Sequence, residues 1–185
     1  MSNDHLGGAI PEGDGNTWMP DVWGYLAIKF NPGIVLDVGC GYGHSTKWWS
    51  DLGCHVVGVD GFQACIDQNV CKKGRIIKHD FATGPYLHGT PFDLVWSCEF
   101  LEHVEERFLP NLKATFQQGR YAVVTHAEPH QSGQHHVNCQ SSSYWIHMFE
   151  SWGFKHLGDE TELLRKSDRH RAAWGRRTLL VFERV

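Results

Sequence analysis

The segment WSCEFLEHVEE, residues 96–106, places two carboxylates and an imidazole close together. Glu99, Glu102 and His103 follow an apolar run that begins at Phe92 and has the composition of a buried strand. Carboxylate oxygens and an imidazole nitrogen can converge on one divalent ion, and this mixed set suits Mg, Mn, Fe or Zn. The spacing therefore indicates one half of a metal site, whose remaining ligand must come from another segment.

The segment THAEPHQSGQHHVN, residues 125–138, carries four of the 13 histidines. It begins within a second apolar stretch, 121–127, so it should reach the same edge of a parallel sheet as Glu99. The missing ligand is expected here. If no ion binds, the candidate general base is His126, at the end of the stretch, or His136.

Apolar runs and helical patterns alternate from residue 34 onward. The expected strands are 34–39, 55–60, 75–80, 91–99, 121–127, 153–158 and 176–185. The expected helices are 18–30, 44–53, 62–74, 104–117 and 141–153, with a short charged helix before the last strand, and Pro110 should kink or split the fourth helix. This alternation predicts an α/β fold with a parallel sheet covered on both faces.

Three glycines follow the first expected strand, in VLDVGCGYG at residues 35–43. Gly39, Gly41 and Gly43 would let the backbone approach a ligand and turn into a helix. A dinucleotide fingerprint needs its third glycine at position 44, which is His, so a nicotinamide enzyme is disfavoured. Asp60 ends the second expected strand, where its carboxylate can accept hydrogen bonds from both ribose hydroxyls of an adenosine ligand.

These residues resemble the class I S-adenosylmethionine-dependent methyltransferases over residues 34–185. VLDVGCGYG, VVGVDG, IKHDF and FDLVWSCEFLEHV match successive motifs of that family in order. The resemblance implies a Rossmann-like, seven-stranded, mostly parallel sheet with a C-terminal antiparallel hairpin. It also implies that S-adenosyl-L-methionine binds the following residues: Asp37, Gly39, Gly41, Gly43, Asp60, Gly61, Asp80, Phe81, Ser97 and Cys98.

A narrower resemblance concerns the acidic motif. Glu99, Glu102 and His103 are similar to the Glu-x-x-Glu-His motif of small-RNA 2′-O-methyltransferases and, more loosely, of ubiquinone-pathway O-methyltransferases. The RNA enzymes add a later histidine before a helix, which His136 matches best and His135 next best. Many metal-free methyltransferases carry a similar stretch, in which the Glu orients the cofactor's end of the pocket and the His caps a helix. Two interpretations therefore stay open: a divalent ion held by Glu99, Glu102, His103 and His136, or no ion and a general base at His126 or His136. The catalytic candidates are His126, His136 and Glu99.

The acceptor is expected to be small. The segment 119–140 resembles compact phage- or virus-encoded methyltransferases of sugars, which implies a carbohydrate hydroxyl on a glycan or nucleotide sugar. Trp18, Trp23, Tyr144 and Trp145 are candidates for stacking on it. The alternatives are a phenolic compound, an RNA 2′-hydroxyl, or cofactor binding without catalysis. The basic run 165–177 is either a phosphate contact or a solvated surface.

Bulk properties are those of one soluble domain. The 185 residues carry a formal charge of −4 and no basic stripe, which disfavours duplex nucleic acid. No apolar run is long enough for a membrane span, and the six cysteines form no CxxC pair, so a cytoplasmic protein with reduced thiols is expected. Residues 1–185 should form a single methyltransferase domain, with 1–33 as an irregular segment and lid helix and 34–185 as the cofactor-binding core. The oligomeric state is not defined by the sequence.

Overall fold

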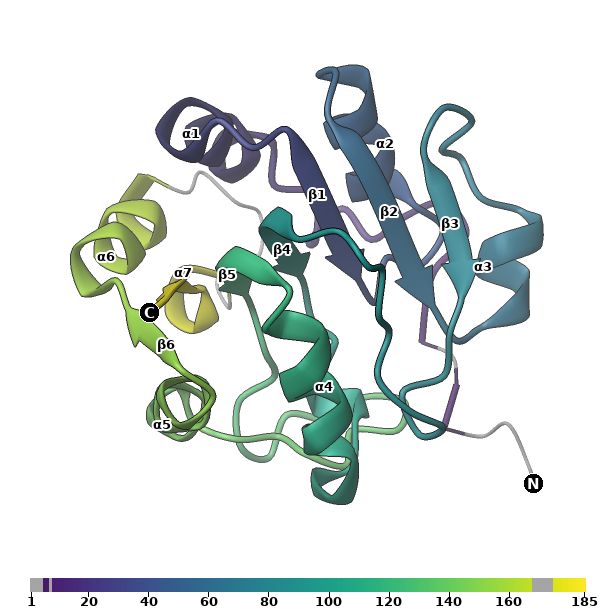
Figure 1. Cartoon of the computed structure of the whole chain (residues 1–185). Coiled ribbons are helices and arrows are strands. Elements are labelled where there is room, and N and C mark those ends of the chain that lie inside the picture. Colours follow the sequence, from purple (N-terminus) through teal and green to yellow (C-terminus); the bar gives the residue numbers. More distant parts are fainter. Residues whose placement is uncertain (1–4, 7, 168–174) are drawn as a thin grey trace.

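A computed structural model describes residues 5–6, 8–167 and 175–185. Its centre is a seven-stranded sheet in the order β3-β2-β1-β4-β5-β7-β6 (Figure 1). The strands are β1 Ile34–Val38, β2 His55–Asp60, β3 Arg75–Lys78, β4 Phe92–Ser97, β5 Gly119–Val124, β6 Phe154–His156 and β7 Leu180–Arg184. The strands β1 to β5 pair in parallel, and β7 is antiparallel to both β5 and β6. The predicted fold class is confirmed.

Helices cover both faces of this sheet (Figure 1). They are α1 Pro20–Phe30, α2 His44–Asp51, α3 Gln63–Asp67, α4 Leu109–Phe116, α5 Ser142–Ser151, α6 Gly158–Ser167 and α7 Gly175–Thr178, with the 3₁₀ turns η1 Leu101–His103 and η2 Glu106–Phe108. One core cluster joins α4 and α5 to the sheet, and a second joins α1, α2 and α6 to the other face.

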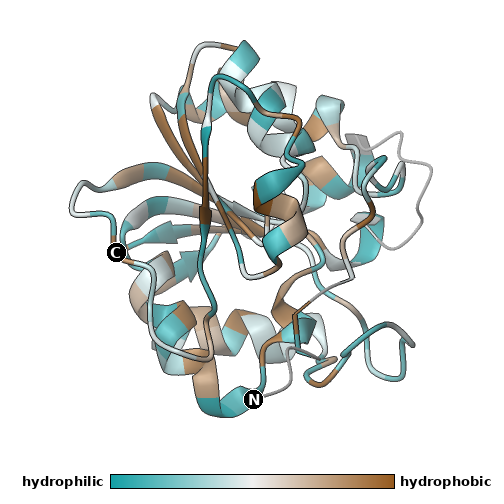
Figure 2. Ribbon diagram, turned by 90° about the vertical axis from the view of Figure 1, so that its right-hand side faces the viewer, coloured by the Kyte–Doolittle hydropathy of each residue, from teal (hydrophilic) through white to brown (hydrophobic). Residues whose placement is uncertain are grey.

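Alternation along the strands produces these two cores. In β4, Leu94 and Trp96 belong to one cluster and Val95 to the other, because successive side chains of a strand point to opposite faces. Because helices cover both faces of the sheet, the central strands carry apolar side chains on both faces. Figure 2 shows hydrophobic colour concentrated along the strands inside the molecule.

Several boundaries differ from the sequence predictions, and three of the differences have an identifiable cause. Pro110 lies in the first turn of α4, where its missing N–H costs no hydrogen bond, so it begins the helix at Leu109 and does not kink it. The helix predicted at 62–74 ends at Asp67, and the N–H of Val70 donates to the carbonyl of Tyr42 instead. The predicted last strand 176–185 begins at Leu180, because α7 occupies its first residues. The middle of the basic run, 168–174, lies outside the described residues.

The carboxyl ends of β1, β2 and β4 meet at one edge of the sheet. The strand order reverses there, between β1 and β4, which is where ligands bind in open α/β sheets. Residues 8–18 continue over this edge before α1 begins. None of the described helices combines the length and hydropathy needed to cross a bilayer.

Candidate functional site

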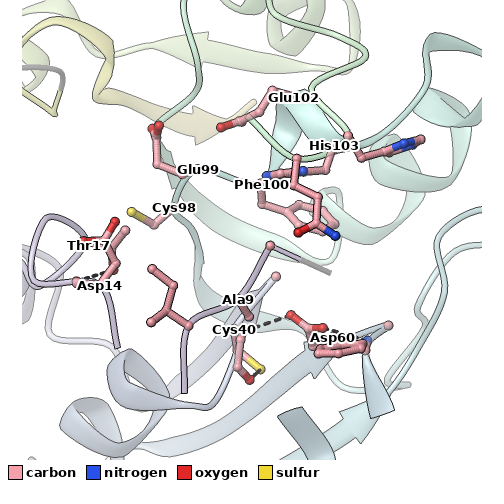
Figure 3. A pocket seen from close by; sticks show the side chains of 18 of the residues that line it. Ala9, Asp14, Thr17, Cys40, Asp60, Cys98, Glu99, Phe100, Glu102 and His103 are labelled. Atoms are coloured by element: carbon pink, nitrogen blue, oxygen red, sulfur yellow. Dashed lines mark hydrogen bonds between the residues drawn. The ribbon is translucent and has the colours of Figure 1, made fainter. Parts of the chain in front are cut away.

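A cavity of about 750 Å³ opens at this edge of the sheet (Figure 3). Its walls come from the glycine loop (residues 39–43), from the segments that follow β2, β3 and β4, from the loop 131–136, and from the N-terminal segment before α1. In Figure 3, Asp60 and Cys40 lie on one side of the cavity and Glu102 and His103 on the other, with Ala9 between them. The loops that the sequence motifs identified therefore surround a single space.

The glycine loop forms the floor beneath this space. Gly39 and Gly41 line the cavity with φ of 70° and 52°, in the left-handed region that favours glycine. A Cβ on Gly39 would lie 2.2 Å from the ring of Phe100. The ring can therefore occupy this position only because residue 39 has no side chain. Gly43 differs from the prediction: it does not line the cavity, and a Cβ there would meet Ile76 at 2.4 Å. Gly43 therefore serves the packing of α2 against β3.

Asp60 lies at the end of β2 and lines the cavity, with Gly61 beside it. Its two carboxylate oxygens accept hydrogen bonds from the N–H groups of Gly41 (2.9 Å) and Phe62 (2.8 Å). Burial raises the pKa of this carboxyl, and the two backbone donors oppose that rise. Each oxygen keeps a second lone pair, so the fixed carboxylate can still accept from ribose hydroxyls.

Asp80 and Phe81 line the same end of the cavity. One oxygen of Asp80 accepts from the N–H of Ala82 at 2.8 Å, and the other lies 3.0 Å from Nε2 of His5. The N-terminal segment thus reaches the groups that the resemblance assigns to adenine, and the side chain of Leu6 packs against Gly61 next to them.

The remaining predicted cofactor residues lie at the ends of β1 and β4. Asp37 lines the cavity, and burial raises its pKa to about 6, although one oxygen accepts from Ser45 and Thr46, each at 2.6 Å. Cys98 also lines the cavity. Ser97 does not: it is fully buried and donates its hydroxyl to the carbonyl of Val38 at 3.0 Å, which joins the two strands.

Glu102, His103 and His136 form a cluster that could hold a metal ion. One ligand atom from each residue lies within 4.8 Å of the others. Glu102 is fully buried, and neither of its carboxylate oxygens has a hydrogen-bond partner. Burial raises the pKa of Glu102, with the charge of Glu99 adding to the rise, and burial lowers that of His103 to about 4. A neutral imidazole is the form that binds metals.

Hydrogen bonds hold this cluster together. The carbonyl of Glu102 accepts from the N–H groups of Val137 and Asn138, both at 3.0 Å, and the Asn138 amide donates to the carbonyl of Val104. Nδ1 of His136 donates to the carbonyl of Gln131 at 3.0 Å. That bond fixes the tautomer that leaves Nε2 with its lone pair, as in the histidine ligands of metal sites.

Glu99 lies apart from the cluster that contains Glu102, although the sequence placed both in one ligand set. Its backbone is left-handed (φ 48°), and its N–H donates to the hydroxyl of Thr125. The side chain stands near Cys98, Asp14 and Thr17, with His103 beyond Glu102 on the other side (Figure 3). Burial raises the pKa of Glu99, and one of its oxygens is buried without a partner.

His126 lies outside the cavity, contrary to its predicted place near an acceptor. The ring is fully buried, and its Nδ1 and Nε2 lie 3.1 Å from the carbonyl of Ala127 and the hydroxyl of Ser142. Burial lowers its pKa to about 4. The side chain points toward Ser142 and Trp145 of α5 and not into the cavity.

The N-terminal wall was predicted from the sequence only as an irregular segment with a lid helix and two candidate tryptophans, without its other contacts. Segment 8–18 has no hydrophobic period, and only contacts distant in sequence place it here: Ala9 packs on Gly41, and Pro11 accepts from His44. Of the predicted lid helix α1, only Trp23 lines the cavity. Among described residues the lining contains no lysine or arginine but eight carboxylates: Glu12, Asp14, Asp37, Asp60, Asp80, Glu99, Glu102 and Glu105.

Comparisons with known proteins agree with this geometry. Residues 36–124 match the family described as Methyltransferase domain. No curated protein matches the sequence. Among solved structures, the fold is similar to a TehB-like SAM-dependent methyltransferase from Corynebacterium glutamicum (18% identity, 92% of this chain and 88% of that one, TM-score 0.66).

Two further structures are similar. Magnesium protoporphyrin IX methyltransferase (ChlM) from Synechocystis PCC 6803 with bound SAH has 17% identity over 89% of this chain and 81% of its own, with a TM-score of 0.66. The methyltransferase domain of bacterial CtHen1 has 14% identity over 88% of this chain and 96% of its own, with a TM-score of 0.60.

The fold is that of the similar methyltransferase structures, and a ligand cavity lies at the carboxyl edge of its sheet. Together with the matched methyltransferase domain, this supports an S-adenosylmethionine-dependent methyltransferase.

Proposed function

We propose that the protein methylates a hydroxyl group of a carbohydrate, with a divalent ion held by Glu102, His103 and His136. S-adenosylmethionine would supply the methyl group from its sulfonium. Gly39, Gly41 and Asp60 would hold the methionine and ribose parts, and Asp80 and Phe81 would lie beside the adenine. The support is that these residues line one cavity, although they come from separate segments.

The observation that carries the metal proposal is the state of Glu102. A fully buried carboxylate with no hydrogen-bond partner on either oxygen is costly, because the nearby backbone N–H groups of Glu102 and Ala127 favour its charge too weakly to offset the lost hydration. The His103 imidazole beside it provides no positive charge, because burial lowers its pKa to about 4. A divalent cation bound there would satisfy the carboxylate and would lower the pKa of an acceptor hydroxyl.

Glu99 is proposed as the general base. Transfer of a methyl to a hydroxyl releases one proton, and an acceptor close to Cys98 would lie beside this carboxylate. A base whose pKa is raised toward neutrality by burial is suited to accept that proton near neutral pH. The hydrogen bond from the Glu99 N–H to Thr125 keeps the turn, and hence the side chain, in place. Of the four metal ligands predicted from the sequence, Glu102, His103 and His136 stay in the proposed metal cluster, and Glu99 becomes the proposed base.

An RNA 2′-hydroxyl is the second candidate acceptor. The order Glu-x-x-Glu-His followed by a later histidine, which resembles the small-RNA enzymes, favours it, and the cluster of Glu102, His103 and His136 supplies that pattern here. The acidic lining of the cavity favours the carbohydrate.

Metal removal tests the proposal. Excess EDTA should abolish methyl transfer but leave the affinity for S-adenosylhomocysteine, measured by calorimetry, unchanged; added Mn²⁺ should restore transfer. His136→Ala should behave as EDTA does. His130→Asn is the matched control, because His130 lies in the same loop, is exposed and does not line the cavity. Full activity in EDTA and in His136→Ala would contradict the metal site.

A further inference from the structure

The charge of the cavity limits what its acceptor can be. Eight carboxylates line it, and within the described part of the chain no lysine or arginine does. Even with a divalent ion and the positively charged cofactor bound, carboxylates outnumber the positive charges. A phosphate group would enter without a guanidinium or ammonium partner, against like charges in a partly enclosed space. Nucleotide sugars and RNA both carry phosphates, whereas glycosides need not.

Trp18 provides an aromatic surface at the rim of the same cavity. Its side chain is 45% exposed and lines the cavity, whereas Trp23 and Trp145 are buried and Tyr144 lies outside it. The rings of Trp18 and Trp23 form a T-shaped pair, with their centroids 5.1 Å apart and an interplanar angle of 87°. Trp23 meets Trp96 in turn at 5.9 Å. The indole of Trp18 is therefore supported from the core, and it retains exposed apolar surface.

Polar groups that hydroxyls can satisfy lie next to Trp18. Asp14 closes a tight turn, in which one carboxylate oxygen accepts from the N–H of Asn16 and the carbonyl accepts from the N–H and hydroxyl of Thr17. The other carboxylate oxygen is left for a ligand. Asp14 lies near enough to Glu99 for their charges to interact, and Figure 3 shows both beside Cys98. The indole N–H of Trp23 is buried without a partner.

We propose that Trp18, Asp14 and Glu99 form the acceptor subsite, and that it takes an uncharged sugar ring: neither a nucleotide sugar nor RNA. The apolar C–H face of the ring would pack on Trp18, and its hydroxyls would donate to the two carboxylates. This inference rests on the proposed function and narrows its substrate to neutral glycosides.

The test measures binding first, so that it does not depend on turnover. Protein saturated with S-adenosylhomocysteine and Mg²⁺ is titrated with the methyl glycosides of glucose, galactose, mannose and N-acetylglucosamine, and with the 6-phosphate of each, by saturation-transfer NMR. At least one neutral glycoside should bind, with its 6-phosphate roughly a hundredfold weaker. Trp18→Ala should weaken binding about tenfold, and Trp18→Phe should recover most of it.

Matched measurements separate the outcomes. Affinity for S-adenosylhomocysteine should be unchanged in Trp18→Ala, which reports that the variant is folded. Tyr144→Ala, an aromatic outside the cavity, should leave glycoside binding unchanged. A 6-phosphate that binds as well as its parent glycoside, or a Trp18→Ala variant with full glycoside affinity, overturns the subsite while the proposed function stands. Absence of both glycoside binding and glycoside methylation overturns the subsite and the proposed function together.

Discussion

Gly133→Ala is expected to damage the metal cluster without damaging the fold. A Cβ on Gly133 would lie 2.1 Å from Nε2 of His136 and 2.4 Å from two ring carbons. Ordinary carbon contacts lie at about 3.5 Å, so the imidazole must retreat by more than about 1 Å. Metal–ligand distances tolerate only about 0.2 Å. Because the obstacle is the end of a side chain and the backbone of Gly133 is not left-handed, the ring moves and the chain still folds.

The magnitude follows from that geometry. Displacing one of the proposed ligands should weaken Mn²⁺ binding by roughly 10- to 100-fold. The free energy of unfolding in EDTA should stay the same or rise by about 0.4–1 kcal/mol, because alanine restricts the unfolded chain. Gly24→Ala is the control: a Cβ there meets no atom within 4 Å, and the residue lies in α1, outside the cavity.

Calorimetric titration with Mn²⁺ in the presence of S-adenosylhomocysteine measures the effect. Combining Gly133→Ala with His136→Ala should add nothing to the loss caused by His136→Ala alone, because both changes act through the same ring. Wild-type Mn²⁺ affinity in Gly133→Ala would refute the assignment of His136 as a ligand.

Three other expectations concern the remaining groups. Asp60→Ala should weaken S-adenosylmethionine and S-adenosylhomocysteine alike, by about 1.5–3 kcal/mol in calorimetry, since the ribose is common to both; unchanged affinities would remove Asp60 from the cofactor site. In EDTA, the free energy of unfolding should fall as the pH rises through the raised pKa of Glu102, between about pH 5 and 8, because the fold favours the protonated carboxyl. Thermal denaturation at several pH values should show that this pH dependence of the free energy of unfolding is weaker in Glu102→Gln and in the presence of Mn²⁺. An equal pH dependence in all samples would contradict its assignment to Glu102. His126→Ala should lower the free energy of unfolding by about 1–3 kcal/mol and leave Mn²⁺ and cofactor affinities unchanged, whereas a selective loss of kcat would restore His126 as a base.

The positions of β1, β2 and β4 could be predicted from the sequence because these strands are buried along most of their length and read as apolar runs, whereas the edge strands β3 and β6 are short and partly exposed. The glycine loop and Asp60 were also identifiable. The glycines with left-handed backbone follow β1 directly, and Asp60 is the last residue of β2. Helix ends were harder to predict: α3 stops early because Val70 bonds to Tyr42, a contact that no local pattern encodes.

Side-chain directions at strand ends were the main source of error in the site. Ser97 and Cys98 are neighbours, yet one joins two strands and the other lines the cavity. Glu99 has a left-handed backbone and is not within the 4.8 Å group of Glu102, His103 and His136, although its charge still raises the pKa of Glu102; a sequence gives no sign of such a backbone at a glutamate. Trp18 was a stacking candidate from the sequence, and the Asp14 turn is closed by local hydrogen bonds, but the proximity of Asp14 to Glu99 joins segments distant in sequence and could be shown only by the fold.

The central claim is a metal-assisted methyltransferase site at Glu102, His103 and His136. A crystal grown with S-adenosylhomocysteine and Mn²⁺, measured for anomalous scattering, tests it most directly. An anomalous peak about 2.0–2.3 Å from one Glu102 oxygen and one nitrogen of each histidine, in the cavity that holds the cofactor, is the predicted result. Clear cofactor density with no anomalous peak at that cluster would contradict the claim.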